Sequence, residues 1–205
     1  MRKRWWILII ILIVIILLFP SRKMVNDGGT IEYSAVLYKV IKWNRMREFE
    51  ENKTGTEIYW FPKNLHSLDY YDAPRPDTVV FGDENQMVVA NIGTYQWSKQ
   101  VDGQTIHINA DAIGPLEMEY KKTLKIRKGE SIRSVSLISN VTKITTYKYE
   151  GDRAQEIQNQ LTYDESNQEI DTSGMDEGVY IIELFVEKGQ DNVLYSFKVE
   201  ILEEK

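Results

Sequence analysis

The sequence predicts an all-β protein that carries one N-terminal transmembrane helix, then a small β juxtamembrane segment, then an antiparallel immunoglobulin-like β-sandwich. Three observations lead to this fold class. An uncharged apolar block occupies residues 5–19. A two-residue hairpin turn of Asp102 and Gly103 lies between arms of alternating apolar and polar residues. Short β-forming segments separated by turns fill residues 85–205, with no long helical period among them.

The composition of the chain excludes several classes of protein. Its 205 residues are 42% hydrophobic and 27% charged, which is typical of a folded chain rather than a disordered one. The absence of cysteine excludes thiol catalysis, cysteine-ligated zinc fingers and iron–sulfur clusters. The formal net charge is −6, and three of the basic residues precede the apolar block. The rest of the chain therefore lacks the clustered cations that nucleic-acid binding requires, and no nucleic-acid partner is expected.

The apolar block predicts a transmembrane signal anchor over residues 5–20. Residues 7–19 are all Ile, Leu, Val or Phe, and together they favour membrane insertion by roughly 4 to 8 kcal/mol. Trp5 and Trp6 suit one membrane interface, and the long side chains of Arg22 and Lys23 can reach the other. The lipid bilayer is therefore the first expected partner, contacted through residues 5–20.

The basic residues before the block set the predicted orientation. Residues 1–4, three of which are basic, are expected to stay in the cytoplasm, and the bulk of the chain then lies outside. The predicted localisation is a single pass of the cell membrane, with the N-terminus cytoplasmic and the C-terminal domain extracellular. A cleaved signal peptide is one alternative, although no A-x-A pattern follows the block. Burial of the block in a soluble core is the other.

Residues 21–84 predict a juxtamembrane β-ribbon and linker. The run NDGG at 26–29 is a turn signal. We expect one long strand over residues 31–43 and a second over residues 57–61, because β-branched and aromatic residues dominate both. A short helix is expected over residues 64–71.

Five aromatic residues of this segment are the candidate binding site. Outside a membrane, aromatic rings can stack on sugars or contact a peptide, and they also fill cores or lie at a lipid interface. The sequence leaves both interpretations open. The five residues are Tyr59, Trp60, Phe61, Tyr70 and Tyr71.

Residues 85–205 predict the immunoglobulin-like β-sandwich, with a small barrel as the alternative. Alternation around the Asp102–Gly103 turn directs Tyr95 and Trp97 toward a core. The segment 178–187 is apolar on both faces and should be a central strand, whereas the polar segment 164–175 reads as a long loop. The remaining strands are expected over residues 116–120, 123–126, 132–139, 143–150, 156–161 and 192–202.

A short motif at residues 177–180, EGVY, resembles the start of a late strand in immunoglobulin-like domains. In those domains a tyrosine hydroxyl bonds back to the chain across the corner. The resemblance therefore implies that the Tyr180 hydroxyl bonds back across the corner.

No catalytic, cofactor-binding or metal-binding residue is predicted. His66 and His107 are the only histidines, no G-x-S-x-G motif is present, and neither histidine has a ligand partner at helical spacing. The carboxylates scatter as solvated side chains do, so an enzyme would have to work with carboxylates alone. The chain is predicted not to be an enzyme.

Two longer stretches are similar to a pattern in uncharacterised exported or membrane-anchored proteins of Gram-positive bacteria. The first combines DGGT at 27–30, EY at 32–33, YKV at 38–40, WN at 43–44 and FPKN at 61–64. The second combines GTYQW at 93–97 with NADAIGPL at 109–116 and resembles an immunoglobulin-like module. The resemblance implies a bacterial source and an envelope location, and it transfers no functional residue.

The predicted function is a non-enzymatic, membrane-anchored extracytoplasmic module of a bacterial envelope that binds or supports another component. Its expected partner, besides the bilayer, is an envelope protein or a wall component. A ligand or glycan sensor that uses the aromatic residues is the alternative, followed by a carboxylate-dependent wall hydrolase.

Overall fold

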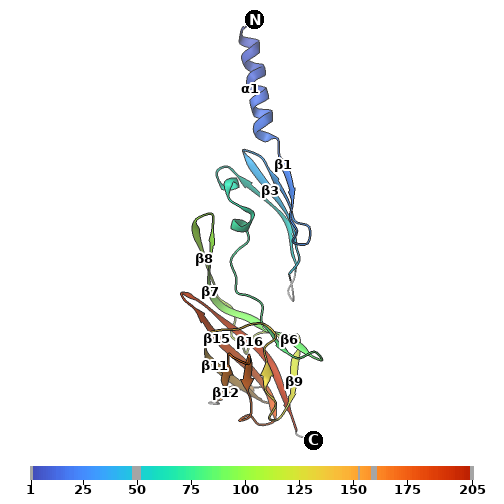
Figure 1. Ribbon diagram of the computed structural model, residues 1–205, viewed down its shortest axis with the longest axis vertical. Coiled ribbons are helices and arrows are strands. Elements are labelled where there is room, and N and C mark those ends of the chain that lie inside the picture. The colour runs from blue at the N-terminus through green and yellow to red at the C-terminus, as the bar shows by residue number, and fades with distance from the viewer. Residues whose placement is uncertain (1, 48–51, 152, 158–160, 204–205) are drawn as a thin grey trace. The chain divides into compact units, whose positions relative to one another are not determined.

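The structure is a computed structural model that describes residues 2–47, 52–151, 153–157 and 161–203 (Figure 1). The chain divides into two compact units, which are treated separately below. The first comprises Met1–Ala73 and Val101–Gly103, and the second Pro74–Gln100 and Gln104–Lys205. Apart from one N-terminal helix and two 3₁₀ turns, the described elements are strands, most of them paired antiparallel. The all-β prediction is therefore confirmed.

The second unit begins at Pro74 and contains the rest of the chain apart from Val101–Gly103. The physical reason is burial, because Val79 and Phe81 belong to the hydrophobic core of that unit. Residues 73–77 are extended and lead directly into this part of the core.

The N-terminal helix α1 (Arg2–Leu18) is apolar over most of its length and on all sides. Its side chains from Trp5 to Ile16 are exposed, because no other described element covers them. Among the helices in the described part of the chain, none is long and apolar enough to cross a membrane.

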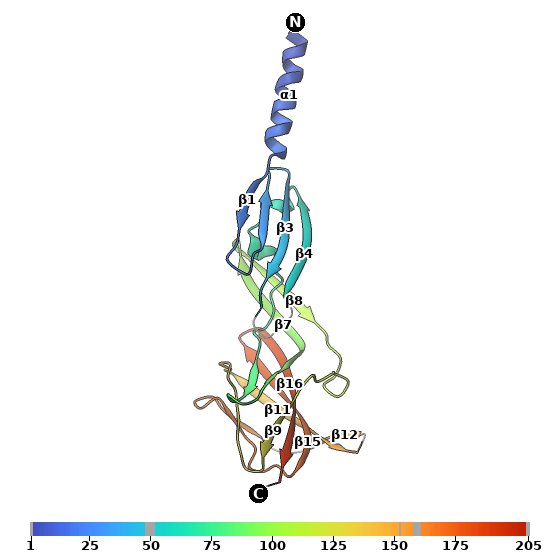
Figure 2. The ribbon, with the colours of Figure 1, turned by 90° about the vertical axis from the view of Figure 1, so that its right-hand side faces the viewer.

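A four-stranded antiparallel sheet follows α1 in the first unit (Figure 2). Its strands follow chain order from one edge to the other. The predicted single strand over residues 31–43 is wrong: the chain turns between two strands there, and the backbone N–H of Ala35 donates to the carbonyl of Tyr38 (2.8 Å). The turn contains neither glycine nor proline, so its sequence gave no break signal. The strands are β1 (Ser21–Met24), β2 (Ile31–Ser34), β3 (Tyr38–Arg45) and β4 (Lys53–Trp60).

Residues 62–72 return from β4 along one side of this sheet. The helix predicted over residues 64–71 is in fact two 3₁₀ turns, η1 (Lys63–Leu65) and η2 (Leu68–Tyr71). They are separated because His66 and Ser67 both adopt extended backbone angles. An extended pair interrupts the i to i−4 hydrogen bonds that a continuous helix needs.

The second unit is built around a seven-stranded sheet with two smaller sheets beside it. The large sheet has the order β12-β11-β15-β16-β7-β8, and β9 pairs parallel with β16. The smaller sheets have the orders β5-β6 and β10-β14-β13, and a bridge between Phe81 and Ser134 connects them. The strands are β5 (Val80–Gly82), β6 (Met87–Val89), β7 (Asn91–Val101), β8 (Gln104–Ala110), β9 (Thr123–Arg127), β10 (Ile132–Arg133), β11 (Val141–Glu150), β12 (Arg153–Ile157), β13 (Thr162–Asp164), β14 (Glu169–Asp171), β15 (Gly178–Lys188) and β16 (Asp191–Leu202).

The core of this unit lies between the large sheet and the smaller ones, as in a sandwich. Phe81 of β5 stacks on Phe197 of β16 with ring centroids 4.1 Å apart. Tyr95 and Trp97 pack against the same core, as predicted. The strand predicted to be central is confirmed, because β15 lies between β11 and β16.

The Tyr180 hydroxyl donates to the carbonyl of Asp176 (2.8 Å), as the EGVY motif implied. Three other predictions were wrong. Residues 116–120 form no strand, and the strand predicted over 132–139 is reduced to β10. The predicted loop over 164–175 contains β14, which pairs with β13 in a hairpin.

Candidate functional site

The alternation of side chains along β3 and β4 gives the N-terminal sheet two different faces. Residues 62–72 lie against one face, which we call the covered face. Its members are mostly charged or aromatic: Glu32, Lys39, Ile41, Trp43, Arg45, Lys53, Glu57 and Tyr59. The opposite, open face carries Tyr33, Tyr38, Val40, Lys42, Thr54, Thr56, Ile58 and Trp60. Both sets follow from the cross-strand register, which places Lys39 beside Tyr59 and Tyr38 beside Trp60.

Three of the five predicted aromatic site residues belong to the covered side. Tyr59 and Tyr71 stack with ring centroids 3.9 Å apart. Tyr70 stacks on the imidazole of His66 at 3.7 Å. One face of each of these rings is therefore occupied from within the unit. Such stacks attach residues 62–72 to the sheet.

The other two predicted site residues lie elsewhere. Trp60 is on the open face, next to the ring of Tyr38 (centroids 5.9 Å apart), and Phe61 follows it at the end of β4. Both are exposed. The structure thus splits the predicted cluster into a stacked group and an exposed pair. The sequence already indicated this split, because successive side chains of a strand point to opposite faces of the sheet and Tyr59 and Trp60 are sequence neighbours.

A buried ion pair lies on the covered face. Lys39 Nζ is 2.7 Å from Glu32 Oε1 and also donates to the backbone carbonyl of His66 (2.6 Å). The Ser34 hydroxyl donates to the same Glu32 oxygen (2.9 Å). Burial acts to raise the pKa of Glu32, but the hydrogen bonds from Lys39 and Ser34 outweigh it and hold the pKa below its ordinary value. Glu32 is therefore ionised at neutral pH.

A second cluster of charges holds the end of residues 62–72, which we call the covering segment. Asp72 bonds to Arg45, to Arg47 (3.3 Å) and to Lys53 (3.1 Å). Burial opposes ionisation of Asp72, but Lys53 and the two arginines lower its pKa overall. Asp27, in the turn before β2, also pairs with Arg45 (3.0 Å). Each of these carboxylates is committed to cations of its own unit, which is typical of a structural network.

The tyrosines on the covered face are hydrogen-bond donors rather than bases. Glu57 accepts from the Tyr59 hydroxyl (2.7 Å) and from Trp43 Nε1 (2.6 Å). Burial and the neighbouring Glu57 raise the pKa of Tyr59 well above its ordinary value. Burial likewise raises the pKa of Tyr71 to about 12. Both phenols stay protonated at neutral pH, so neither can act as a nucleophile or general base there.

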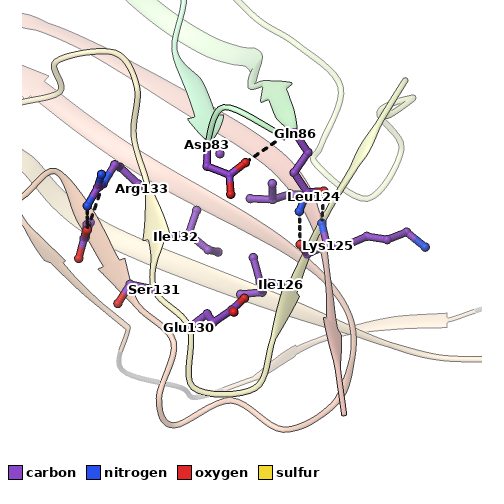
Figure 3. Close-up of a pocket in the computed structure, with 11 residues that line it drawn as sticks. Asp83, Gln86, Leu124, Lys125, Ile126, Glu130, Ser131, Ile132 and Arg133 are labelled. Carbon is purple, nitrogen blue, oxygen red and sulfur yellow. Dashed lines mark hydrogen bonds and ion pairs between the residues drawn. The ribbon is translucent and has the colours of Figure 1, made fainter. Parts of the chain in front are cut away.

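A cavity of about 280 Å³ opens in the second unit between the β5–β6 turn, β9 and β10 (Figure 3). Leu124, Ile126 and Ile132 are its buried apolar members. The β5–β6 turn is tied to β9, because the Gln86 side chain accepts from the Lys125 backbone N–H (3.0 Å) and donates to its carbonyl. No local sequence pattern predicts this cavity, because its walls come from segments far apart in the chain.

The acidic groups around this cavity are engaged in local structure. Asp83 accepts from the backbone N–H groups of the turn, which lower its pKa. Glu130 accepts from the Arg127 backbone N–H (2.8 Å), and Glu169 pairs with Arg133 (2.9 Å). A glycosidase needs a carboxylic acid whose pKa is raised beside a second carboxylate. The pKa of Asp83 is lowered rather than raised, so this carboxyl does not meet that requirement.

The two histidines belong to different units of the chain. His66 stacks on Tyr70, and His107 is exposed on β8. Within the described ranges, no three or more His, Cys, Asp or Glu side chains are grouped so that they could hold a metal ion.

Comparison of the chain with family models, with curated proteins and with solved structures found no match in any of the three. The resemblance to exported proteins of Gram-positive bacteria therefore stays a prediction.

Proposed function

We propose that the protein is a non-enzymatic, membrane-anchored module of a bacterial envelope, with α1 in the cytoplasmic membrane and both β units outside. The observation that carries this proposal is α1 itself. A helix that is apolar on all sides and covered by no other described element exposes a surface that water disfavours. A lipid bilayer is the solvent that suits such a surface, and the basic residues 2–4 favour a cytoplasmic N-terminus.

The remainder of the chain supports an extracytoplasmic role. Its charged side chains form local ion pairs, and its acidic balance is opposite to that of a nucleic-acid binder. The sandwich-like second unit and the corner bond of Tyr180 support the finer assignment to an immunoglobulin-like module. Such modules commonly serve as binding or spacer elements, and the edge strands β4 and β12 offer main-chain groups to a partner strand.

Substitution inside α1 tests the anchor. Each arginine at the centre of a membrane helix costs about 3 kcal/mol and removes about 0.5 kcal/mol of apolar gain. Replacing Ile11 and Val14 by arginine therefore costs about 7 kcal/mol, which matches the whole predicted insertion energy. We expect the I11R/V14R variant to leave the membrane fraction of cells, while the matched I11L/V14L variant stays there.

Protease added to intact cells tests the orientation. We expect digestion of both β units in the unsubstituted protein. Recovery of the unsubstituted protein in the soluble fraction, or full protection of its β units in intact cells, would contradict the proposal.

Crosslinking on intact cells, followed by recovery of the tagged protein, then identifies a partner. A wall-material gel that clears around the protein would favour the hydrolase instead.

A further inference from the structure

We propose that the end of the N-terminal sheet next to α1 inserts its exposed aromatic and aliphatic side chains into the outer membrane–water interface. This proposal rests on the function proposed above, because it requires α1 to be in the bilayer. We call this surface the apolar rim. Its members come from the β2–β3 turn, the end of β4 and η1: Val36, Leu37, Trp60, Phe61 and Leu65.

The apolar rim is attached to α1 by hydrogen bonds. The backbone N–H of Leu37 donates to the Leu17 carbonyl at the end of the helix (3.4 Å), and the Tyr38 hydroxyl donates to the carbonyl of Leu18 (3.2 Å). The N–H of Phe61 donates in turn to the carbonyl of Leu37 (2.9 Å). The end of β4 therefore lies at the same level as the end of the helix.

The buried side chain of Asn64 fixes the last member of the rim. Its Nδ2 donates to the backbone carbonyls of Ala35 and Val36, each at 3.0 Å. This pair of bonds holds η1 against the β2–β3 turn. Leu65, the next residue, is consequently held beside the turn, with 67% of its side chain exposed.

Exposure of this kind has a cost in water. Trp60 is 64% exposed and Phe61 is 59% exposed. Both large aromatic side chains at the end of β4 are therefore mostly in contact with solvent. Tryptophan, together with tyrosine, is enriched at membrane interfaces, because an aromatic ring with a polar atom suits the headgroup level. The Tyr38 ring beside Trp60 adds a second such side chain.

The length of α1 favours the same location. Its 17 residues span about 25 Å, whereas the hydrocarbon core of a bilayer is about 30 Å thick. A helix that is too short draws its flanking residues toward the membrane. The apolar rim lies at the end of α1 that would be drawn in.

The charges near the rim suit lipid headgroups. Arg22, Lys23 and Lys63 are all exposed on the elements that adjoin it, whereas Glu32, the nearest acid on β2, is buried and paired with Lys39. Basic side chains at this level attract anionic phosphate groups. The partner of the apolar rim is therefore a bilayer that contains anionic lipid.

The absence of cysteine makes a direct test simple, because any single cysteine can be labelled uniquely. The full chain is reconstituted in vesicles of phosphatidylcholine and phosphatidylglycerol, with a nitroxide at position 65, 56 or 11. Leu65→Cys reports on the rim, Thr56→Cys on the open face farther along β4, and Ile11→Cys on α1. Collisions with oxygen, which dissolves in lipid, are compared with collisions with a polar nickel chelate.

We expect oxygen collisions to dominate at positions 11 and 65, and nickel collisions to dominate at position 56. Adding W60S/F61S should shift position 65 toward the nickel-accessible range without changing position 11. If position 11 is in lipid but position 65 is as accessible to nickel as position 56, the rim does not insert and only the anchor stands. If position 11 is itself exposed to nickel, the anchor and the rim are both refuted.

Discussion

Asp72 is the residue at which three cations of the N-terminal unit meet, and replacing it by asparagine should loosen the covering segment. An exposed ion pair contributes about 0.2–1 kcal/mol, while breaking a buried one costs about 3–5 kcal/mol. The Asp72 side chain is 15% exposed and its three partners about 20%. We therefore expect the D72N substitution to cost an intermediate amount, about 2 kcal/mol.

Hydrogen–deuterium exchange read by mass spectrometry is a suitable assay, because it reports each unit separately in the full chain. A loss of about 2 kcal/mol corresponds to exchange about 30-fold faster. This acceleration should appear in peptides from β3 and β4 and not in peptides from β15 and β16. The matched control is D69N, because Asp69 is 62% exposed and 3.9 Å from Arg45.

The control should change exchange by no more than about 5-fold, because an exposed pair contributes at most about 1 kcal/mol. Equal effects of D72N and D69N would refute the assignment of Asp72 as the centre of the network. Equal acceleration in both units would refute the prediction that the effect of Asp72 is confined to the N-terminal unit. Lowering the pH should reproduce the D72N effect. The pKa of Asp72 is lower in the folded state than in the unfolded state, so its carboxylate stabilises the folded unit fully above the unfolded pKa. That stabilisation is lost as the pH falls through the folded pKa.

Three further substitutions concern the second unit, and thermal or urea unfolding measures each. G82A should cost at least about 3 kcal/mol, because Gly82 has φ +130° and an added Cβ would lie 2.0 Å from the Gln86 carbonyl oxygen; an unchanged midpoint would contradict this. Y180F should cost about 1 kcal/mol through loss of the bond from Tyr180 to Asp176, and a neutral result would remove the corner bond as a stabilising feature. E183Q should stabilise the unit at pH 7, with a gain that shrinks toward pH 4. Burial raises the pKa of Glu183, so the folded state favours the protonated form and loses stability as the pH rises through the folded pKa; a gain that did not vary with pH would contradict this cause.

The features that sequence predicted well are local ones. The Asp102–Gly103 turn sets its own hairpin, and the apolar run of β15 identifies a central strand without reference to other segments. The bond from Tyr180 spans only four residues and follows from a short motif. Each of these patterns carries its physical cause within a few neighbouring residues.

The features that sequence missed depend on contacts between distant segments. The parallel pairing of β9 with β16 joins residues such as Leu124 and Val199, and no local pattern specifies which strand β9 meets. Similarly, the break between β2 and β3 is stabilised by backbone bonds and by Asn64 from a distant segment. The polar interior of the covered face was also missed, because Glu32 and Lys39 read as solvated until their partners are known.

The five aromatic residues of the candidate site were proposed as one cluster, and their arrangement on the sheet was not predicted. The five aromatic residues do lie in one unit, yet Tyr59 and Trp60 face opposite sides of a strand. Treating residues 57–61 as a strand already implied this separation. The sequence could not show that residues 62–72 return over one side only, which decides which rings are stacked and which remain exposed.

The position of β16 has a consequence for biosynthesis. This strand comes last along the described chain, yet it pairs with β15, β7 and β9. The second unit therefore cannot close its large sheet until Leu202 has left the ribosome or the translocation channel, and its earlier strands must wait without their central neighbour. The β1–β4 meander pairs only consecutive strands and can form as soon as it emerges. A chaperone that protects nascent chains would accordingly be needed by residues 74–190 and far less by residues 21–72.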